Sequence, residues 1–242
     1  MIALTFDIDW AEDWLIEDTL AILDANGARA TFFATHDTPV LLGLDRRRFE
    51  IGLHPNFLPL LNKREGSATE ILDEVFTRYP EAKGFRSHGL VTSPSLLEHA
   101  AAIGMVYDSN QFLPEPTTPF LDYQGLWRTA FFWRDTRPAP RGKPYDFADL
   151  QLPEETPAIF CFHPVHVFLN TESSARYKEA RSHLADRKVL SEYRNTTAEL
   201  GARDFLVAIL AARPGDSTHR MMDVIAAVSG QGAKLRQPGP GC

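Results

Sequence analysis

The sequence of 242 residues has few cysteines, no excess of basic residues and no long apolar run. Its two cysteines, Cys161 and Cys242, do not form the kind of disulfide framework that stabilises small secreted domains. Lysine and arginine total 25 against 32 acidic residues and are scattered, which argues against a nucleic-acid-binding surface. No apolar stretch reaches the roughly 20 residues that a membrane-spanning helix needs.

The chain also begins without the positively charged segment of a secretory signal peptide, and acidic residues appear by position 7. We therefore expect a cytoplasmic protein. The composition is that of a globular protein, 44% hydrophobic and 24% charged, which is enough to bury a sizeable core. The length suits one α/β barrel, so we expect a single domain over residues 1–242. Nothing in the sequence indicates an oligomeric state.

Short apolar runs alternate with segments of helical periodicity through the first half of the chain. The apolar runs predict buried strands at 2–6, 30–35, 49–54, 84–87, 105–108 and, later, 157–163. The periodic segments predict helices at 11–26, 39–44, 68–79 and 95–103, and a largely helical region at 172–230. Repeated strand–helix alternation is typical of βα units, and hence of a parallel sheet or barrel of the α/β class.

The regular alternation stops in the middle of the chain. Residues 109–157 contain many of the prolines and predict a long irregular excursion with one or two short strands, one of them at 125–133. The glycine- and proline-containing end of the chain predicts a disordered tail from about residue 231.

Polar side chains suited to acid–base chemistry or metal binding follow most of the predicted strands. They are Asp7 and Asp9 after the first strand, His54 after the third, Arg86 and His88 after the fourth, Asp108 in the fifth, and His163 and His166 after the last. The carboxyl ends of parallel strands gather at one face, so these residues are expected to converge on one site. Strand alternation would also place Asp7 and Asp9 on the same side, so that one could bind a cation while the other acts as a base.

Five short motifs occur in a fixed order along nearly the whole chain. They are Thr5-Phe6-Asp7-Ile8-Asp9, Glu50-Ile51-Gly52-Leu53-His54, Gly84-Phe85-Arg86-Ser87-His88-Gly89, Tyr107-Asp108-Ser109 and Phe160-Cys161-Phe162-His163-Pro164. This series resembles the polysaccharide deacetylase family, the NodB-homology carbohydrate esterases. The resemblance implies a distorted, incomplete (β/α) barrel. It also implies a metal-dependent hydrolase that removes an N-acyl group, N-acetyl in the first instance, from a sugar or sugar-containing precursor.

The resemblance further implies a division of catalytic roles. Asp7 would be the general base, and Arg86 would hold it in place and keep its pKa low. His163 would be the general acid that protonates the leaving amine, and Asp108 would stabilise its imidazolium form.

A divalent metal ion and no organic cofactor are implied as well. Asp9 and His54 would bind the ion, which would be Zn²⁺ in the first instance, with Co²⁺, Mn²⁺ or Ni²⁺ as alternatives. The chain departs from the family at Leu58, where a second histidine of the metal motif is expected. Either the third ligand comes from elsewhere in the chain or the metal is weakly bound or absent. The candidates for a third ligand are Asn56 and His88, and we favour His88 slightly because imidazole suits zinc better than an amide does.

Two further residues are candidates for substrate binding. Trp10 lies beside Asp9 and could stack on a sugar ring, whereas Trp127 and Trp133 are expected in packing roles. His166 completes the sequence His163-Pro-Val-His166 at the exit of the last strand, where a solvent-facing position is the simpler alternative.

Three other functions stay open at this level. The missing second histidine favours hydrolysis of another C–N bond, as in a cyclic imide or ureide, with little or no metal. A non-catalytic sugar-binding member of the fold is a further alternative, although such a protein has no physical reason to keep an acid, a base and their partners. Asp-x-Asp after a strand also begins haloacid dehalogenase-like phosphatases, but the later strand ends here lack the lysine and acidic pair that those enzymes need.

Overall fold

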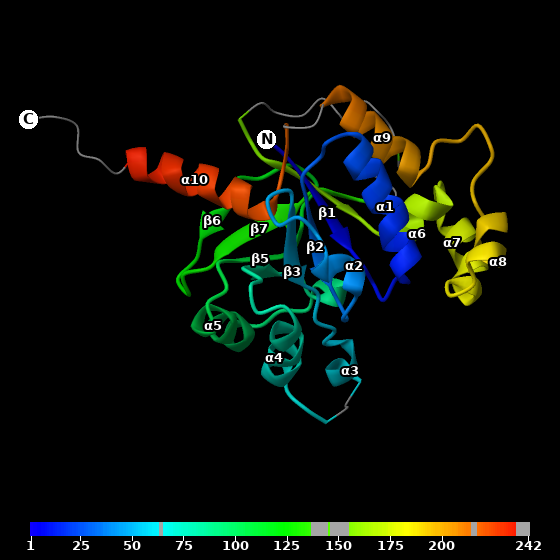
Figure 1. Ribbon diagram of the computed structural model, residues 1–242. Coiled ribbons are helices and arrows are strands. Elements are labelled where there is room, and N and C mark those ends of the chain that lie inside the picture. The colour runs from blue at the N-terminus through cyan, green and yellow to red at the C-terminus, as the bar shows by residue number, and fades with distance from the viewer. Residues whose placement is uncertain (63–64, 137–144, 146–154, 214–216, 236–242) are drawn as a thin grey trace, which may run out of the picture.

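The structure is a computed structural model that describes residues 1–62, 65–136, 145, 155–213 and 217–235, the side chains of 231–235 excepted. Within these residues the strands form one sheet in the order β6-β7-β5-β4-β3-β2-β1-β9-β8, and β10 pairs with β1 at one side. Figure 1 shows the strands at the centre, with helices α1, α6 and α9 on one side and α4 and α5 on another.

The strands are short and mostly buried. Their bounds are β1 Ile2–Asp7, β2 Ala30–Ala34, β3 Phe49–Leu53, β4 Gly84–Phe85, β5 Tyr107–Phe112, β6 Phe120–Leu121, β7 Trp127–Phe131, β8 Trp133–Arg134, β9 Ala158–Phe162 and β10 Thr218–His219. The described pairings are parallel except that of β6 with β7. Phe132, between β7 and β8, donates its N–H to the carbonyl of Ile159 in β9, so the sheet curls until its two ends approach. The expected distorted, incomplete barrel is confirmed.

Helices connect the strands, and several of them, among them α1, α6 and α9, pack on the outside of the curled sheet. Their bounds are α1 Asp13–Ala25, α2 Pro39–Leu42, α3 Leu58–Leu61, α4 Ala68–Arg78, α5 Pro94–Ala102, α6 Pro164–Leu169, α7 Ser174–Ala180, α8 Arg187–Glu192, α9 Ala202–Ala212 and α10 Met221–Leu235. Helix α4 begins with a capping box, in which the Ser67 hydroxyl accepts from the Glu70 N–H and the Glu70 carboxylate accepts from the Ser67 N–H. Among the described residues no helix is both long and apolar enough to cross a bilayer.

Alternating residues of the strands build two apolar layers. One face, which includes Phe6 and Phe160, packs against the surrounding helices. The other face lines the inside of the barrel and includes Phe33, Tyr107 and Cys161. Helix α10 packs on this inner layer and is tied to the starts of β2 and β3, which leaves the carboxyl ends of the strands for a site.

Two segments that were expected to be irregular are partly described by the structure. In the described part of the excursion at 109–157, the strand expected at 125–133 is present as β7, which pairs in parallel with β5, and the short strand β8 pairs with β9. Residues 137–144 and 146–154 of the excursion lie outside the described residues. Helix α10 extends to Leu235, and the rest of the tail expected from about residue 231, residues 236–242, lies outside the described part.

Candidate active site

A buried ion pair lies at the carboxyl end of β1. Asp7 is the last residue of that strand, and its Oδ1 accepts a hydrogen bond from Nη1 of Arg86 at 2.8 Å. Burial alone would raise the pKa of Asp7, but the positive charge of Arg86 and the neighbouring imidazoles of His54 and His163 together outweigh it, and the pKa is lowered. Asp7 is therefore an ionised carboxylate at neutral pH, as a general base must be. The predicted pairing of Asp7 with Arg86 is confirmed.

Arg86 is fixed from several directions inside the barrel. Its guanidinium carbon lies 4.4 Å and 4.5 Å from the ring centroids of Phe33 and Phe131. Its Nη2 donates to the hydroxyl of Ser109 at 2.9 Å, and its Nη1 also donates to the hydroxyl of Thr5. A guanidinium held in this way presents a fixed donor to Asp7 and restricts the carboxylate to one orientation.

The chain then leaves β1 through a strained turn. Asp9 and Trp10 both have positive φ values, 43° and 57°, which are unfavourable for residues other than glycine. The turn is held by the Trp10 N–H, which donates to the hydroxyl of Thr35 at 3.1 Å. The sequence argument assumed that strand alternation places Asp9 on the same side as Asp7. Strand β1 ends at Asp7, so alternation does not determine where Asp9 points. The left-handed turn brings its carboxylate to the site instead.

Asp9 is the centre of a group of three side chains that could hold a metal ion. His54 Nε2 lies 3.1 Å and His88 Nδ1 lies 3.0 Å from the same oxygen, Oδ1 of Asp9. Burial alone would raise the pKa of Asp9, but the two imidazole hydrogen bonds lower it, so the carboxylate is ionised. Two imidazoles and one carboxylate form a donor set that zinc and similar divalent ions accept, so these residues fit the expected metal.

The two candidates for the third ligand have different surroundings. His88 follows β4 and lies against Asp9, beside the ring of His54. Asn56 uses its Oδ1 to accept the N–H of Leu58 at 3.1 Å. The position of the missing histidine is filled by Leu58, whose side chain lies next to Gly89. His88, which follows β4, thus lies next in the chain to Gly89, the residue that contacts the leucine at the motif position.

On the other side of Asp9 lies a histidine with its own carboxylate. His163 follows β9, and its Nδ1 lies 2.6 Å from Oδ1 of Asp135, while its backbone N–H donates to Oδ2 of the same residue at 2.6 Å. Burial alone would lower the pKa of His163, but the charge and hydrogen bond of Asp135 raise it to about 9. His163 is therefore protonated at neutral pH, as a general acid must be.

The expected pairing of Asp108 with His163 is wrong. Asp108 is buried, and its carboxylate binds the guanidinium of Arg128 and the side-chain amide of Asn110. The physical reason is the pleat of β5: Ser109 points into the barrel toward Arg86, so its neighbour Asp108 points to the other face. The carboxylate that takes this role, Asp135, directly follows β8 and was missed because its strand lies in the excursion that we expected to be irregular.

A pocket of about 140 Å³ opens beside Asp9 and His163. Trp10 lines it, is 49% exposed and has its ring edge-on to His88 at 5.3 Å between centroids. His166 also lines it but is buried, and burial lowers its pKa to about 4. The solvent-facing alternative for His166 is therefore wrong, and its ring instead packs against Tyr177, which sequence reasoning did not single out. Trp133 is in the core, as expected.

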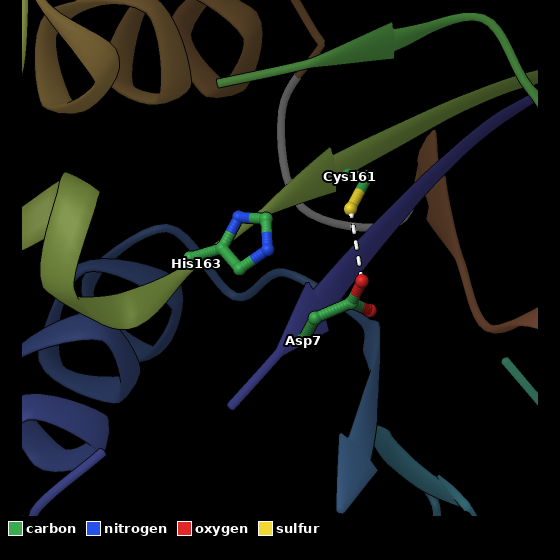
Figure 2. A group of neighbouring side chains, drawn as sticks. All are labelled: Asp7, Cys161 and His163. Atoms are coloured by element: carbon green, nitrogen blue, oxygen red, sulfur yellow. Dashed lines mark hydrogen bonds between the residues drawn. The ribbon is translucent and has the colours of Figure 1, made fainter. Parts of the chain in front are cut away.

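One further group beside Asp7 was not expected from the sequence. Figure 2 shows Cys161, from β9, pointing toward the carboxylate of Asp7. The thiol donates to Oδ2 of Asp7 across 3.3 Å. The predicted convergence thus holds for most of the candidates. Arg86 binds Asp7, His54, His88 and His163 lie within 3.5 Å of Asp9, and His163 also lies near Asp7. Asp108 and Asn56 bind other partners.

Comparison with known proteins gives a consistent result. A family model described as WbmS-like polysaccharide deacetylase matches residues 4–181. A crystal structure from Bordetella bronchiseptica, described as a polysaccharide deacetylase involved in O-antigen biosynthesis, is 34% identical to this chain with a TM-score of 0.76. That similarity covers 87% of this chain and 90% of the other. The search of curated proteins finds no match.

More distant structures share the fold alone. One from Mycobacterium smegmatis, described as a polysaccharide deacetylase, is 18% identical with a TM-score of 0.54, and the match covers 96% of this chain and 91% of that one. The peptidoglycan deacetylase PdaC from Bacillus subtilis is 13% identical with a TM-score of 0.55, over 97% of this chain and 94% of that one.

Proposed function

The chain belongs to the WbmS-like polysaccharide deacetylase family and is thus a deacetylase-like hydrolase of amide bonds, and we propose that it removes an N-acetyl group from a sugar-containing precursor. The observation that carries this proposal is a single arrangement of side chains. An ionised carboxylate, Asp7, and a protonated imidazole, His163, stand next to a group of metal-ligating side chains centred on Asp9.

The acid and the base are held for these roles by partners of their own. Asp7 receives the proton of the attacking water, because Arg86 keeps its carboxylate ionised and oriented. His163 gives its proton to the leaving amine nitrogen, and Asp135 stabilises the charged ring until then. The sum of the two transfers is hydrolysis of the amide to a carboxylate and an amine.

Asp9, His54 and His88 are the residues that would hold a divalent cation in this proposal. When bound there, the cation would polarise the amide carbonyl and lower the pKa of a bound water molecule. Zn²⁺ is our first choice for this ion, with Co²⁺, Mn²⁺ and Ni²⁺ as alternatives, because the donor set contains two imidazoles. The ligating side chains of Asp9 and His88 are 26% and 29% exposed, so the site is accessible to solvent and substrate.

The substrate that we propose is a nucleotide-linked or lipid-linked N-acetyl sugar, or another O-antigen building block. The relative from Bordetella bronchiseptica supports this proposal, because it is described as involved in O-antigen biosynthesis. The half-exposed ring of Trp10 at the pocket edge supports a sugar, since pyranose rings stack on aromatic faces.

The direct test is acetate release from N-acetylated sugar nucleotides by the purified protein loaded with Zn²⁺, Co²⁺ or Mn²⁺. We expect turnover with at least one metal and substrate, and loss of turnover in the Asp7→Asn variant, which keeps the shape of the side chain without its basicity. Acetate release that persists in this variant would overturn the assignment of Asp7 as the base.

A chelator distinguishes the metal-dependent reaction from the alternative hydrolysis of a cyclic imide or ureide. We expect activity to fall on chelation and to return when Zn²⁺ or Co²⁺ is restored. Full activity of the metal-free protein, or turnover of a cyclic imide only, would favour the alternative. Sugar binding without turnover in a metal-loaded sample would favour the non-catalytic role.

A further inference from the structure

Cys161 gives the site a chemical feature that deacetylation does not use. Its Sγ lies 3.3 Å from Oδ2 of Asp7, and a ring nitrogen of His163 completes a group of three ligand atoms that all lie within 4.8 Å of one another. Figure 2 shows one ring nitrogen of His163 turned toward the other two side chains. All three residues are buried, with exposed fractions of 5% for Asp7, 1% for Cys161 and 8% for His163.

The orientation of His163 favours the binding of a cation. Its Nδ1 is occupied by the carboxylate of Asp135, so Nε2 is the nitrogen that faces the interior of the site. A histidine whose other nitrogen is held by a carboxylate is the usual arrangement of metal-ligating histidines, because the carboxylate fixes the ring and increases its basicity. Sulfur, nitrogen and oxygen ligands together are those of soft or borderline ions.

We propose that Asp7, Cys161 and His163 form a second metal site, specific for thiophilic divalent ions such as Zn²⁺, Cd²⁺ or Co²⁺, and that its occupation inhibits the enzyme. It is distinct from the group around Asp9, which offers no sulfur. A metal ion in this second site takes the lone pairs of both the base and the acid. The inhibitory part of the proposal rests on the proposed function, whereas the binding part stands without it.

The charges near the two sites indicate which of them binds a metal ion more tightly. A cation at the second site lies close to the guanidinium of Arg86, which already binds the other oxygen of Asp7. It also requires the buried thiol and Nε2 of the protonated His163 each to lose a proton, and both protons pass to the solvent. The group around Asp9 has no arginine bonded to its carboxylate in the described residues and needs no thiol deprotonation. The second site is therefore the weaker one and fills only when metal exceeds one equivalent.

Titration with Co²⁺ tests this site without an activity assay, because a thiolate bound to Co²⁺ gives a charge-transfer band in the near ultraviolet. The sample is the Cys242→Ser variant, in which Cys161 is the one remaining thiol of the chain. We expect no such band with the first equivalent of Co²⁺ and a saturating band with the second. The Cys161→Ser/Cys242→Ser double variant provides the blank and should show no band at any concentration.

Activity measured on the same samples connects the site to inhibition. In the Cys242→Ser variant we expect acetate release to rise with the first equivalent and to fall as the thiolate band rises. Absence of the band in excess Co²⁺ overturns the second site, and a band that saturates with the first equivalent overturns the ranking of the two sites. A band without any measurable acetate release contradicts the proposed function alone, so the two failures are distinguishable.

Discussion

The clearest prediction concerns Asp135, because the structure assigns to it the role that the sequence suggested for Asp108. Replacement of Asp135 by asparagine keeps the size of the side chain and removes its charge. The carboxylate is the group that raises the pKa of His163 to about 9 against the effect of burial. In the Asp135→Asn variant the pKa of His163 should therefore fall to its ordinary value of 6.5 or below.

The size of the effect follows from the fraction of His163 that carries a proton. At about pH 8, roughly nine-tenths of the side chains are protonated if the pKa is about 9, but only about 3% if it is 6.5. The loss of kcat/KM should thus be about thirtyfold or greater at this pH. His166 indicates that the loss can be larger, since burial lowers the pKa of this neighbouring imidazole to about 4.

The assay is a pH profile of kcat/KM for the wild type, Asp135→Asn and Asp108→Asn. A general acid works in its protonated form, so a raised pKa extends activity to higher pH, and its loss moves the alkaline limb to lower pH. The deficit of Asp135→Asn should shrink as the pH falls, which a merely misfolded variant would not show. The reasoning is refuted if Asp135→Asn keeps the wild-type alkaline limb, or if Asp108→Asn is the variant that shifts it.

Three further predictions concern metal binding and packing. Loss of an outer-sphere partner of a metal ligand weakens metal binding roughly 10–100-fold, and His88→Ala should weaken zinc binding by more than this. Asn56→Ala should leave the zinc affinity unchanged. Both affinities can be measured by equilibrium dialysis, and equal effects of the two variants would contradict the ligand assignment. Arg86→Met leaves the buried carboxylate of Asp7 without its ion-pair partner and should lower the free energy of unfolding by about 3–5 kcal/mol. Urea titrations measure this difference, and a loss under about 1 kcal/mol would contradict the buried ion pair. Gly84→Ala places a Cβ 2.3 Å from the ring of Tyr107 and should lower the free energy of unfolding by about 1–3 kcal/mol. In the control variant Gly230→Ala the added Cβ has no atom within 4 Å, so this variant should not be destabilised. The reverse order of stabilities in urea titrations would contradict the packing around Gly84.

Much of the site could be predicted because its signals are local. Asp7, His54, Arg86 and His163 each come at or just after a short apolar run, and the rule that parallel strands end at one edge brings them together. No detail of side-chain packing was needed for that step. The capping box before α4 is local in the same way, since Ser67 and Glu70 are three residues apart.

The partner of His163 could not be predicted in this way, because it depends on a pairing between distant segments. Strand β8 has two residues and becomes a strand by pairing with β9, where Trp133 is in register with Phe160. Its apolar pattern was visible in the sequence, but the neighbouring prolines suggested an irregular segment. Asp108 was chosen instead from a short motif, and the pleat of β5 turns it away from the site.

The group of side chains around Asp9 differs from the arrangement that the sequence motif predicts. The motif expects its second imidazole one helical turn after His54, but the chain has Leu58 there, and that side chain fills space against Gly89. Gly89 has a φ of 72°, and a Cβ there would lie 3.1 Å from Leu58, so this close approach needs a glycine. The residue before it, His88, lies against Asp9. Because the parallel strands β3 and β4 end at the same rim, the connection after β4 can bring an imidazole to the carboxylate of Asp9 although the connection after β3 has a leucine at the motif position.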